Sequence, residues 1–158
     1  MSTATPATRG LDKAKTAYKV REYHYDPSAD RIGIAAAEAL GVAPGLVLKT
    51  LMVEVDGKPA ACVVPSDRTL SMKRVAAAFG GKSAAMMPPD RAERLTGFHT
   101  GGISPFGQKK RVPVVFEADT AGLGEVVING GKRGMMVVID VDAAITATGA
   151  AAKPLCAD

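Results

Sequence analysis

The sequence has few of the residues on which disulfide-bonded or metal-dependent proteins rely. Its 158 residues include two cysteines, two histidines and no tryptophan, and aromatic residues make up only 4%. Two cysteines do not build a disulfide framework, so a reducing, cytoplasmic location is expected. Cys62 lies in an apolar run and is predicted to be a core residue. Cys156, close to the end, is predicted to be a free thiol on a mobile tail.

Long apolar stretches are also missing. No run approaches the ~18–20 residues of a membrane span, and residues 1–10 lack the basic-then-apolar order of a signal peptide. A hydrophobic fraction of 47% with a charged fraction of 23% indicates a folded protein with an aliphatic core. The length fits one domain, residues 1–158, and the formal net charge of +4 permits a polyanionic partner without identifying one.

The signatures of common hydrolases and nucleotide-binding proteins are absent. There is no Gly-x-Ser-x-Gly motif, and His24 and His99 do not stand in a metal-ligand spacing. The segment Gly80-Gly81-Lys82-Ser83 ends like a phosphate loop, but it follows a predicted helix where a phosphate loop follows a strand. It is therefore interpreted as a helix stop, and no metal or cofactor is expected.

The hydrophobic pattern predicts short helices and strands in one α+β domain. Helices are expected from Thr5-Pro6 onward, over 34–40, 72–79 and 90–95, and from a cap at Asp142 to near Gly149. Strands are expected over 17–25, 47–55, 59–65, 112–117, 125–128 and 135–141. Asp56-Gly57 and residues 129–134 predict hairpins. Strands joined by hairpins, with helices gathered beside them, are typical of the α+β class.

Two glycine-rich segments could supply converging backbone N–H groups. Gly101-Gly102, followed by Ile103-Ser104, predicts a fixed irregular loop, and Gly130-Gly131 predicts a tight hairpin. Adjacent glycines let amides meet at one point, as in an oxyanion hole, although a plain turn is the alternative for each. Basic residues at 109–111 and 132–133 flank these loops and suit either a phosphate backbone or a solvated rim.

Lys49 interrupts the apolar strand 47–55. Held inside a sheet face, its ammonium group would lose hydration and would need a partner or a chemical role. The alternative, an outward-facing strand residue, fits the spacing equally well.

These residues belong to a set of segments that recurs, in the same order, in a known family. The segments are Thr5-Pro6-Ala7, Tyr23 with Asp26-Pro27, Val47-Leu48-Lys49-Thr50-Leu51, Thr96-Gly97, residues 101–110 and Gly130-Gly131-Lys132-Arg133-Gly134. Through them the chain resembles the YbaK family, free-standing relatives of the editing domain of bacterial prolyl-tRNA synthetase. The resemblance covers nearly the whole chain, and the Gly-Gly-Ile-Ser-Pro and Lys-Thr-Leu segments are its most specific parts.

The resemblance implies an α+β domain with a curved, mixed, mostly antiparallel sheet flanked by helices. It also implies an aminoacyl-tRNA deacylase that removes a wrong amino acid, typically cysteine, from tRNA(Pro). The implied partners are the acceptor end of tRNA(Pro) and, in a complex, prolyl-tRNA synthetase. In the cysteine-specific relatives the substrate's own thiol is thought to attack its ester, which fits the absence of a protein nucleophile here.

The resemblance also implies a role for each site residue. Lys49 would hold the aminoacyl ester or the 3′ end of the tRNA, and Gly101 and Gly102 would direct N–H groups at the ester carbonyl. The implied substrate-contacting residues are Tyr23, Ile32, Thr50, Ile103, Ser104, Asn129, Gly130, Gly131 and Met136.

Three positions depart from the family pattern. Asn129 replaces a serine, Met136 replaces an aspartate, and Ile32 stands where relatives have an aromatic residue. Family membership survives these changes, but the identity of the amino acid removed does not follow from it. Ala- or 2-aminobutyryl-tRNA(Pro) is the alternative substrate, and a non-catalytic module that binds tRNA or a partner protein is the alternative function.

Overall fold

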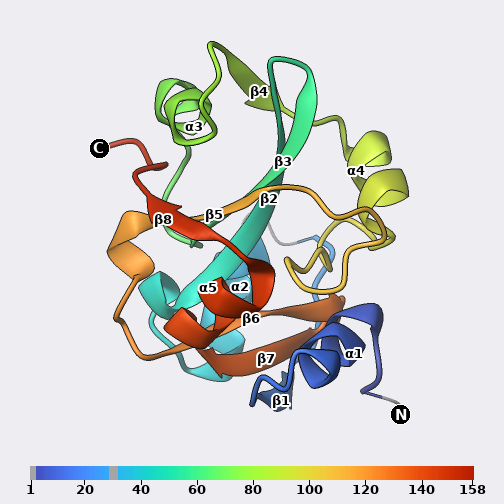
Figure 1. The fold of residues 1–158 in the computed structure, drawn as a ribbon. Coiled ribbons are helices and arrows are strands. Elements are labelled where there is room, and N and C mark those ends of the chain that lie inside the picture. The colour runs from blue at the N-terminus through green and yellow to red at the C-terminus, as the bar shows by residue number, and fades with distance from the viewer. Residues whose placement is uncertain (1–2, 29–31) are drawn as a thin grey trace.

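One mixed sheet of eight strands forms the centre of the molecule (Figure 1), and the computed structural model describes residues 3–28 and 32–158. The strands are β1 (Lys19–Glu22), β2 (Val47–Val55), β3 (Lys58–Pro65), β4 (Ala84–Met86), β5 (Val114–Glu117), β6 (Glu125–Lys132), β7 (Met135–Asp140) and β8 (Ala151–Lys153). Their order is β1-β7-β6-β2-β3-β5-β8, with β4 paired to β2. Within the described residues four pairings are antiparallel and three are parallel. The predicted α+β class with a mixed, mostly antiparallel sheet is confirmed.

The described helices are α1 (Pro6–Lys13), α2 (Ile32–Leu40), α3 (Met72–Ala78), α4 (Pro89–Thr96) and α5 (Val141–Thr148). Among them, three begin after a polar capping residue: Thr5 for α1, Ser71 for α3 and Asp140 for α5. A capping box between Thr5 and Thr8 starts α1. The predicted cap of α5 at Asp142 is wrong, because β7 runs straight into this helix. The carboxylate of Asp140, two residues earlier, accepts the capping N–H of Ala143.

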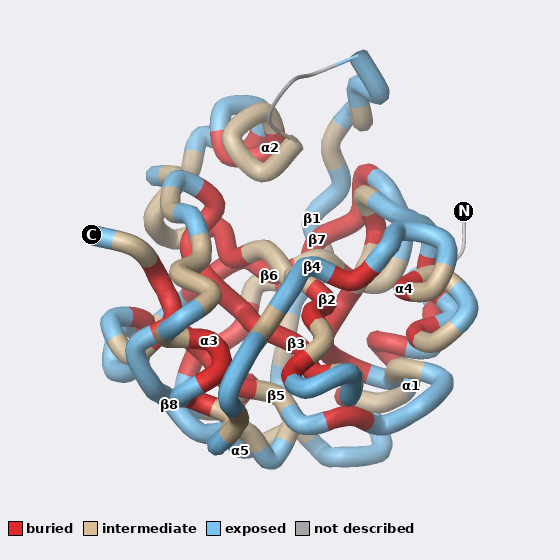
Figure 2. Tube along the Cα trace, turned by 90° about the horizontal axis from the view of Figure 1, so that it is seen from above, coloured by how far each residue is buried: buried red, intermediate tan, exposed pale blue. Residues whose placement is uncertain are grey.

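Helices cover both faces of the sheet. Successive side chains of a strand point to opposite faces, so neighbouring residues of β2, β6 and β7 enter different cores. The core under α1 and α5 includes Leu11, Leu48, Ile128, Val137 and Ala144. The core under α2 includes Ala37, Leu40, Val47, Val127 and Met136. Figure 1 and Figure 2 show α2 on one side of the sheet and α5 on the other, with the buried residues concentrated in the central strands.

One edge of β2 is left open in its middle. Along the other edge β3 pairs with β2 from Leu48 to Val55. On the open edge β6 pairs only with Val47 and Leu48, and β4 pairs only from Val53 to Val55. The Met87 N–H, just after β4, donates to the Met52 carbonyl oxygen, so in the described chain no segment pairs with residues 49–51 on this edge. This opening in the sheet positions the candidate site.

The predicted hairpin at Asp56-Gly57 is confirmed, with φ of +50° and +80° at the two residues. Its aspartate also explains the phosphate-loop-like segment. The N–H groups of Lys82 and Ser83 donate to the Asp56 carboxylate at 3.0 Å each. An internal carboxylate thus occupies the amides that a phosphate loop would offer to a nucleotide.

The prediction of a mobile tail at Cys156 is wrong. Cys156 is fully buried, and its N–H donates to Oε1 of Glu117 at 2.9 Å. The guanidinium group of Arg74 also bonds the Cys156 carbonyl oxygen and the Asp158 carboxylate. Cys62 is a core residue, as predicted.

Candidate active site

A cavity of about 460 Å³ opens between the middle of β2, the start of α2, β4, α4 and the loop that follows α4. It brings together eight residues that the sequence singled out: Tyr23, Ile32, Lys49, Thr50, Gly101, Ile103, Asn129 and Met136. The remaining four, Gly102, Ser104, Gly130 and Gly131, lie outside its lining. The opening in the sheet explains the position, because it leaves residues 49–51 half-buried and without a neighbouring strand on that edge of the described sheet.

Lys49 lines this cavity. Its spacing allowed either a position inside a sheet face or an outward-facing one, and the structure shows the side chain at the cavity wall. Its side chain is half-buried, and Nζ donates to the carbonyl oxygen of Ser66 at 3.4 Å. A cation at an apolar cavity wall favours a substrate in which negative charge resides or develops.

Thr50 offers both its side chain and its main chain to the cavity. Its Oγ1 is buried. Among the described residues, it is the one buried side-chain oxygen or nitrogen atom that has no hydrogen-bond partner. In an antiparallel pair, every second residue of a strand directs its backbone N–H and C=O groups at the same neighbour. The Ser66 N–H donates to the Val47 carbonyl oxygen, so it is the odd-numbered residues of β2 that direct their backbone groups at β3. The backbone N–H and C=O of Thr50 therefore face the open edge. An unsatisfied buried hydroxyl normally signals a missing partner, here a bound ligand.

The loop at Gly101 is fixed from three sides. The Thr100 N–H donates to Glu93 Oε2 at 2.8 Å, and Arg133 Nε donates to the Thr100 carbonyl oxygen at 2.8 Å. Asn129 Nδ2 reaches the Gly101 carbonyl oxygen at 3.3 Å. Gly101 has a φ of +90°, and a Cβ there would lie 2.7 Å from the Tyr25 hydroxyl oxygen, so both backbone and packing require glycine.

Gly102 supports the loop and does not face the cavity. Its N–H donates to the His99 carbonyl oxygen at 2.8 Å, and a Cβ would lie 2.9 Å from the backbone nitrogen of Arg133. Of the two amides predicted to meet the ester carbonyl, the one at Gly102 is thus already engaged. Gly101 remains the candidate donor of this pair.

The other three predicted residues outside the lining are bound within the protein. Ser104 is fully buried, and its Oγ accepts the Phe106 N–H at 3.2 Å. The Gly130 carbonyl oxygen accepts the Thr5 hydroxyl at 2.6 Å, and the Gly131 N–H donates to Asn129 Oδ1 at 2.6 Å. These residues shape the loop and the β6–β7 hairpin that support the cavity wall.

Sequence reasoning missed several residues of the site. Met52, Met86, Met87, Ser66 and Thr100 also line the cavity. The Met86-Met87-Pro88-Pro89 segment carried no local periodicity, and only the pairing of β4 with β2 brings it to the open edge. Arg133, assigned from sequence to a basic cluster, lies over the Tyr25 ring, with Cζ 5.3 Å from the ring centroid.

The electrostatics argue against either cysteine of the protein as a nucleophile. Burial raises the pKa of Cys62 to about 12 and that of Cys156 to about 11, so both thiols stay protonated in the core. Burial, with Tyr25 nearby, also raises the pKa of Tyr23, which keeps its phenol a hydrogen-bond donor at neutral pH.

In the part of the chain that the structure describes, no group of three or more His, Cys, Asp or Glu could hold a metal. Among these same residues no helix has the length and apolar character needed to cross a membrane.

Known proteins share both the sequence and the fold. A family model described as the aminoacyl-tRNA editing domain matches residues 26–146. An Enterococcus faecalis protein named "Putative Cys-tRNA(Pro)/Cys-tRNA(Cys) deacylase EbsC" is 33% identical over 147 residues, which cover 91% of this chain and 88% of that protein. The proline–tRNA ligase of Nitratidesulfovibrio vulgaris is 31% identical over 105 residues, which cover 66% of this chain but only 17% of the ligase.

A solved structure described as "a putative trans-editing enzyme for prolyl tRNA synthetase" superposes with a TM-score of 0.81 at 24% identity, covering 98% of this chain and 99% of that one. At that identity the superposition shows a shared fold. The family model covers well over half of the chain, and together with the relatives it confirms the predicted family and the predicted class of activity, aminoacyl-tRNA deacylation. The chain belongs to the aminoacyl-tRNA editing domain family.

Proposed function

We propose that this protein is a trans-acting deacylase that clears mischarged tRNA(Pro), with Cys-tRNA(Pro) as its preferred substrate. The observation that carries the proposal is the buried hydroxyl of Thr50 beside Lys49 in the cavity, which finds no hydrogen-bond partner among residues 3–28 and 32–158. A ligand carrying hydrogen-bonding groups would satisfy this hydroxyl, as an aminoacyl ester or a ribose does. The name of the Enterococcus faecalis relative supports cysteine as the amino acid removed.

The proposed roles follow from the position of each group. The Lys49 ammonium group and the Gly101 N–H stabilise the oxyanion that forms at the ester carbonyl. Thr50 orients the ester or the terminal ribose through its hydroxyl and its backbone groups. Neither cysteine of the protein has an accessible thiolate to act as nucleophile.

As nucleophile we propose the thiol of the cysteinyl substrate, the role that the resemblance to the cysteine-specific relatives implies. The thiol sulfur forms a bond with the ester carbonyl carbon, the bond from that carbon to the ribose oxygen breaks, and the thiol proton ends on the ribose oxygen. The products are a cysteine thiolactone and tRNA with a free terminal hydroxyl. The protein's contribution is to fold the substrate into this reactive geometry and to stabilise the developing charge.

A second candidate substrate is favoured by the apolar wall of the cavity. Four methionines, Met52, Met86, Met87 and Met136, line it. Unbranched thioether side chains adapt to irregular shapes, so an aliphatic side chain such as that of alanine or 2-aminobutyrate fits as well. Comparing Cys- and 2-aminobutyryl-tRNA(Pro) separates the two, because the second substrate has no thiol. Cleavage of the cysteinyl ester alone supports thiol attack, whereas similar rates for both require water as the nucleophile.

Single-turnover deacylation of Cys-tRNA(Pro) tests the function. Lys49→Ala removes one charge-assisted contact, about 1.5–3 kcal/mol, and is expected to lower the rate roughly tenfold to a hundredfold. Thr50→Val keeps the shape but removes the hydroxyl, and it is expected to lower the rate by a smaller factor. Lys73→Ala removes the same charge from an exposed position of α3 and should leave the rate unchanged.

Three results would contradict the proposal. One is full activity in a folded Lys49→Ala variant. Another is equal loss of activity in Lys73→Ala. The third is the absence of turnover on any mischarged tRNA, which would favour a module that binds tRNA or a partner protein without catalysis.

We further propose that tRNA identity is read in a complex with prolyl-tRNA synthetase. The matching segment of the Nitratidesulfovibrio vulgaris ligase is 17% of that chain, so the ligase carries a similar domain joined to much additional protein. This chain, at 158 residues and a net charge of +4, offers little surface for recognising a whole tRNA. Adding the synthetase should therefore lower the tRNA concentration needed for half-maximal deacylation, and no change would contradict the complex.

A further inference from the structure

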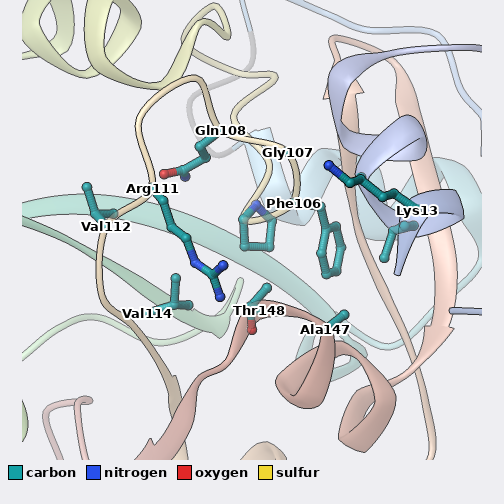
Figure 3. Close-up of a pocket in the computed structure, with 12 residues that line it drawn as sticks. Lys13, Phe106, Gly107, Gln108, Arg111, Val112, Val114, Ala147 and Thr148 are labelled. Atoms are coloured by element: carbon teal, nitrogen blue, oxygen red, sulfur yellow. The ribbon is translucent and has the colours of Figure 1, made fainter. Parts of the chain in front are cut away.

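A second cavity lies on the other side of the sheet from the candidate active site. It has a volume of about 360 Å³ and is formed by α1, the loop over 105–112 and the end of α5. Figure 3 shows Lys13 of α1 and Arg111 of the loop on opposite walls, with the ring of Phe106 between them. The close approach of Gly10 to Gly107, where a Cβ on Gly10 would lie 3.2 Å from the Gly107 backbone, fixes the distance between the walls.

The charge at this cavity has one sign. Its lining contains two cations, Lys13 and Arg111, and no carboxylate among the described residues. Neither cationic head group has a hydrogen bond or ion pair within residues 3–28 and 32–158. Two uncompensated cations on opposite walls of one cavity produce a positive potential that attracts an anion.

The other polar side chains of the lining are already engaged as donors. Gln108 Nε2 donates to the Ser104 carbonyl oxygen at 3.0 Å. Thr148 Oγ1 donates to the carbonyl oxygens of Ala144 and Ile145. Lys13 and Arg111 are therefore the groups available to hold an anion.

The floor of the cavity is apolar. It is made by Leu11, Pro105, Phe106, Val112, Val114 and Ala147. A ligand that fits this arrangement has an anionic end for the two cations and a less polar body for the floor. The planar guanidinium of an arginine suits phosphate oxygens in particular.

We propose that this second cavity binds a phosphate ester of nucleotide size, with the phosphate between Lys13 and Arg111 and the organic part on the apolar floor. The volume matches the lower end of ordinary small-ligand sites, about 300–1,000 Å³. The phosphate ester can come from a free nucleotide or from a nucleotide of RNA. The proposal does not depend on the deacylase activity, because none of its residues lines the active-site cavity.

Titration of the isotope-labelled wild-type protein with AMP, followed by amide resonances in solution, tests the proposal. AMP is expected to shift resonances of residues 107–112 and 147–149, and adenosine, which lacks the phosphate, is not. The double variant Lys13→Gln/Arg111→Gln is expected to bind AMP at least about tenfold more weakly, from the loss of two charge-assisted contacts. Lys73→Gln, which removes one charge far from the cavity, is expected to bind within about twofold of wild type.

Arg111 also lies beside the end of α5, where its Nη2 is 3.3 Å from the position of a Cβ on Gly149. A cation there can stabilise the helix C-terminus. The single variant Lys13→Gln leaves the end of α5 unchanged, so weaker AMP binding in this variant cannot come from that helix. Lys13 lies in the last turn of α1, so the melting temperature of the variant is measured alongside.

Competition identifies the source of the phosphate. If uncharged tRNA displaces AMP, the proposed site exists and its ligand is RNA. If AMP binds and tRNA does not displace it, the site exists and its ligand is a free nucleotide. The proposal is overturned if AMP shifts no resonance of this cavity at about 5 mM, or if the double variant binds AMP as the wild type does. None of these outcomes depends on the deacylation rate of the Lys49→Ala variant.

Discussion

Glu117 holds the C-terminal segment in place, and its replacement should destabilise the whole protein. The carboxylate is 3% exposed, and it accepts three backbone N–H groups. Oε1 accepts those of Leu155 and Cys156 at 2.9 Å each, and Oε2 accepts that of Asp119 at 2.8 Å. In Glu117→Gln the amide oxygen can replace one carboxylate oxygen, but the amide nitrogen must face an N–H and leaves it without an acceptor.

The magnitude follows from these contacts. One buried donor left unsatisfied costs about 1–3 kcal/mol, and two charge-assisted bonds that become neutral lose about 0.5–1.5 kcal/mol each. The expected loss of unfolding free energy is therefore about 2–6 kcal/mol. For a chain of this length it corresponds to a fall in melting temperature of roughly 4–24 °C. Glu125→Gln, the same change at an exposed residue of β6, should stay within about 0.5 kcal/mol of wild type.

The pH dependence of this loss is a second readout. Burial alone would raise the pKa of Glu117, but the N–H groups of Leu155, Asp119 and Cys156 outweigh it and hold the pKa below its ordinary value. The stabilisation is thus complete above the unfolded pKa of about 4.3 and is lost as the pH falls through the lower folded value. In urea unfolding the gap between wild type and Glu117→Gln should shrink below about pH 4. A gap of constant size between about pH 7 and pH 3, or a variant as stable as Glu125→Gln, would refute the reasoning.

Two further predictions concern the active-site cavity. Arg133→Gln removes the bond to the Thr100 carbonyl oxygen and the contact with the Tyr25 ring, together about 1–2 kcal/mol, so the deacylation rate should fall roughly fivefold to thirtyfold with little change in tRNA affinity. Lys132→Gln is the matched control, and a similar rate loss there would assign the effect to charge. Met136→Asp should change the ratio of Cys- to 2-aminobutyryl-tRNA(Pro) cleavage by an amount worth about 1–3 kcal/mol. An unchanged ratio would mean that this side chain does not contact the substrate.

Local signals in the sequence were sufficient for most of the secondary structure. The Asp56-Gly57 turn, the two strands beside it and the cap of α1 depend on residues close together in the chain, and all are found as predicted. The three-residue strands β4 and β8 were missed, because they are short and depend on strands distant in sequence. The buried position of Cys156 was missed for the same reason, since Glu117 lies 39 residues away.

The face on which Lys49 lies could not be predicted from alternation alone. A strand pattern assigns residues to two faces, but it does not say where a neighbouring strand is missing. Only the topology does so, with β6 leaving β2 after Leu48 and β4 joining it at Val53. Arg133 illustrates the converse, because a basic pair in sequence suggested phosphate contacts while its guanidinium group donates to a loop carbonyl.

The two glycine pairs that the sequence suggested as separate binding loops form one assembly, joined by Asn129. The prediction of a turn at Gly130-Gly131 is wrong, because both lie in a bulge of β6, which runs on to Lys132. Asn129 Oδ1 accepts the N–H groups of Gly131 and Lys132, and its Nδ2 reaches the carbonyl oxygen of Gly101. The shorter side chain of serine, which the resemblance implies at this position in the cysteine-specific relatives, could not span the same groups.

Asn129 is also the cross-strand partner of Met136, with Nδ2 4.0 Å from the Met136 sulfur. Both positions that depart from the family pattern in this hairpin therefore lie side by side on the cavity wall, and side chains in contact contribute non-additively. The asparagine fixes the Gly101 loop while the methionine makes the adjoining wall apolar, so the two departures act as a single change. The effect of either substitution on substrate preference must depend on which residue occupies the other position.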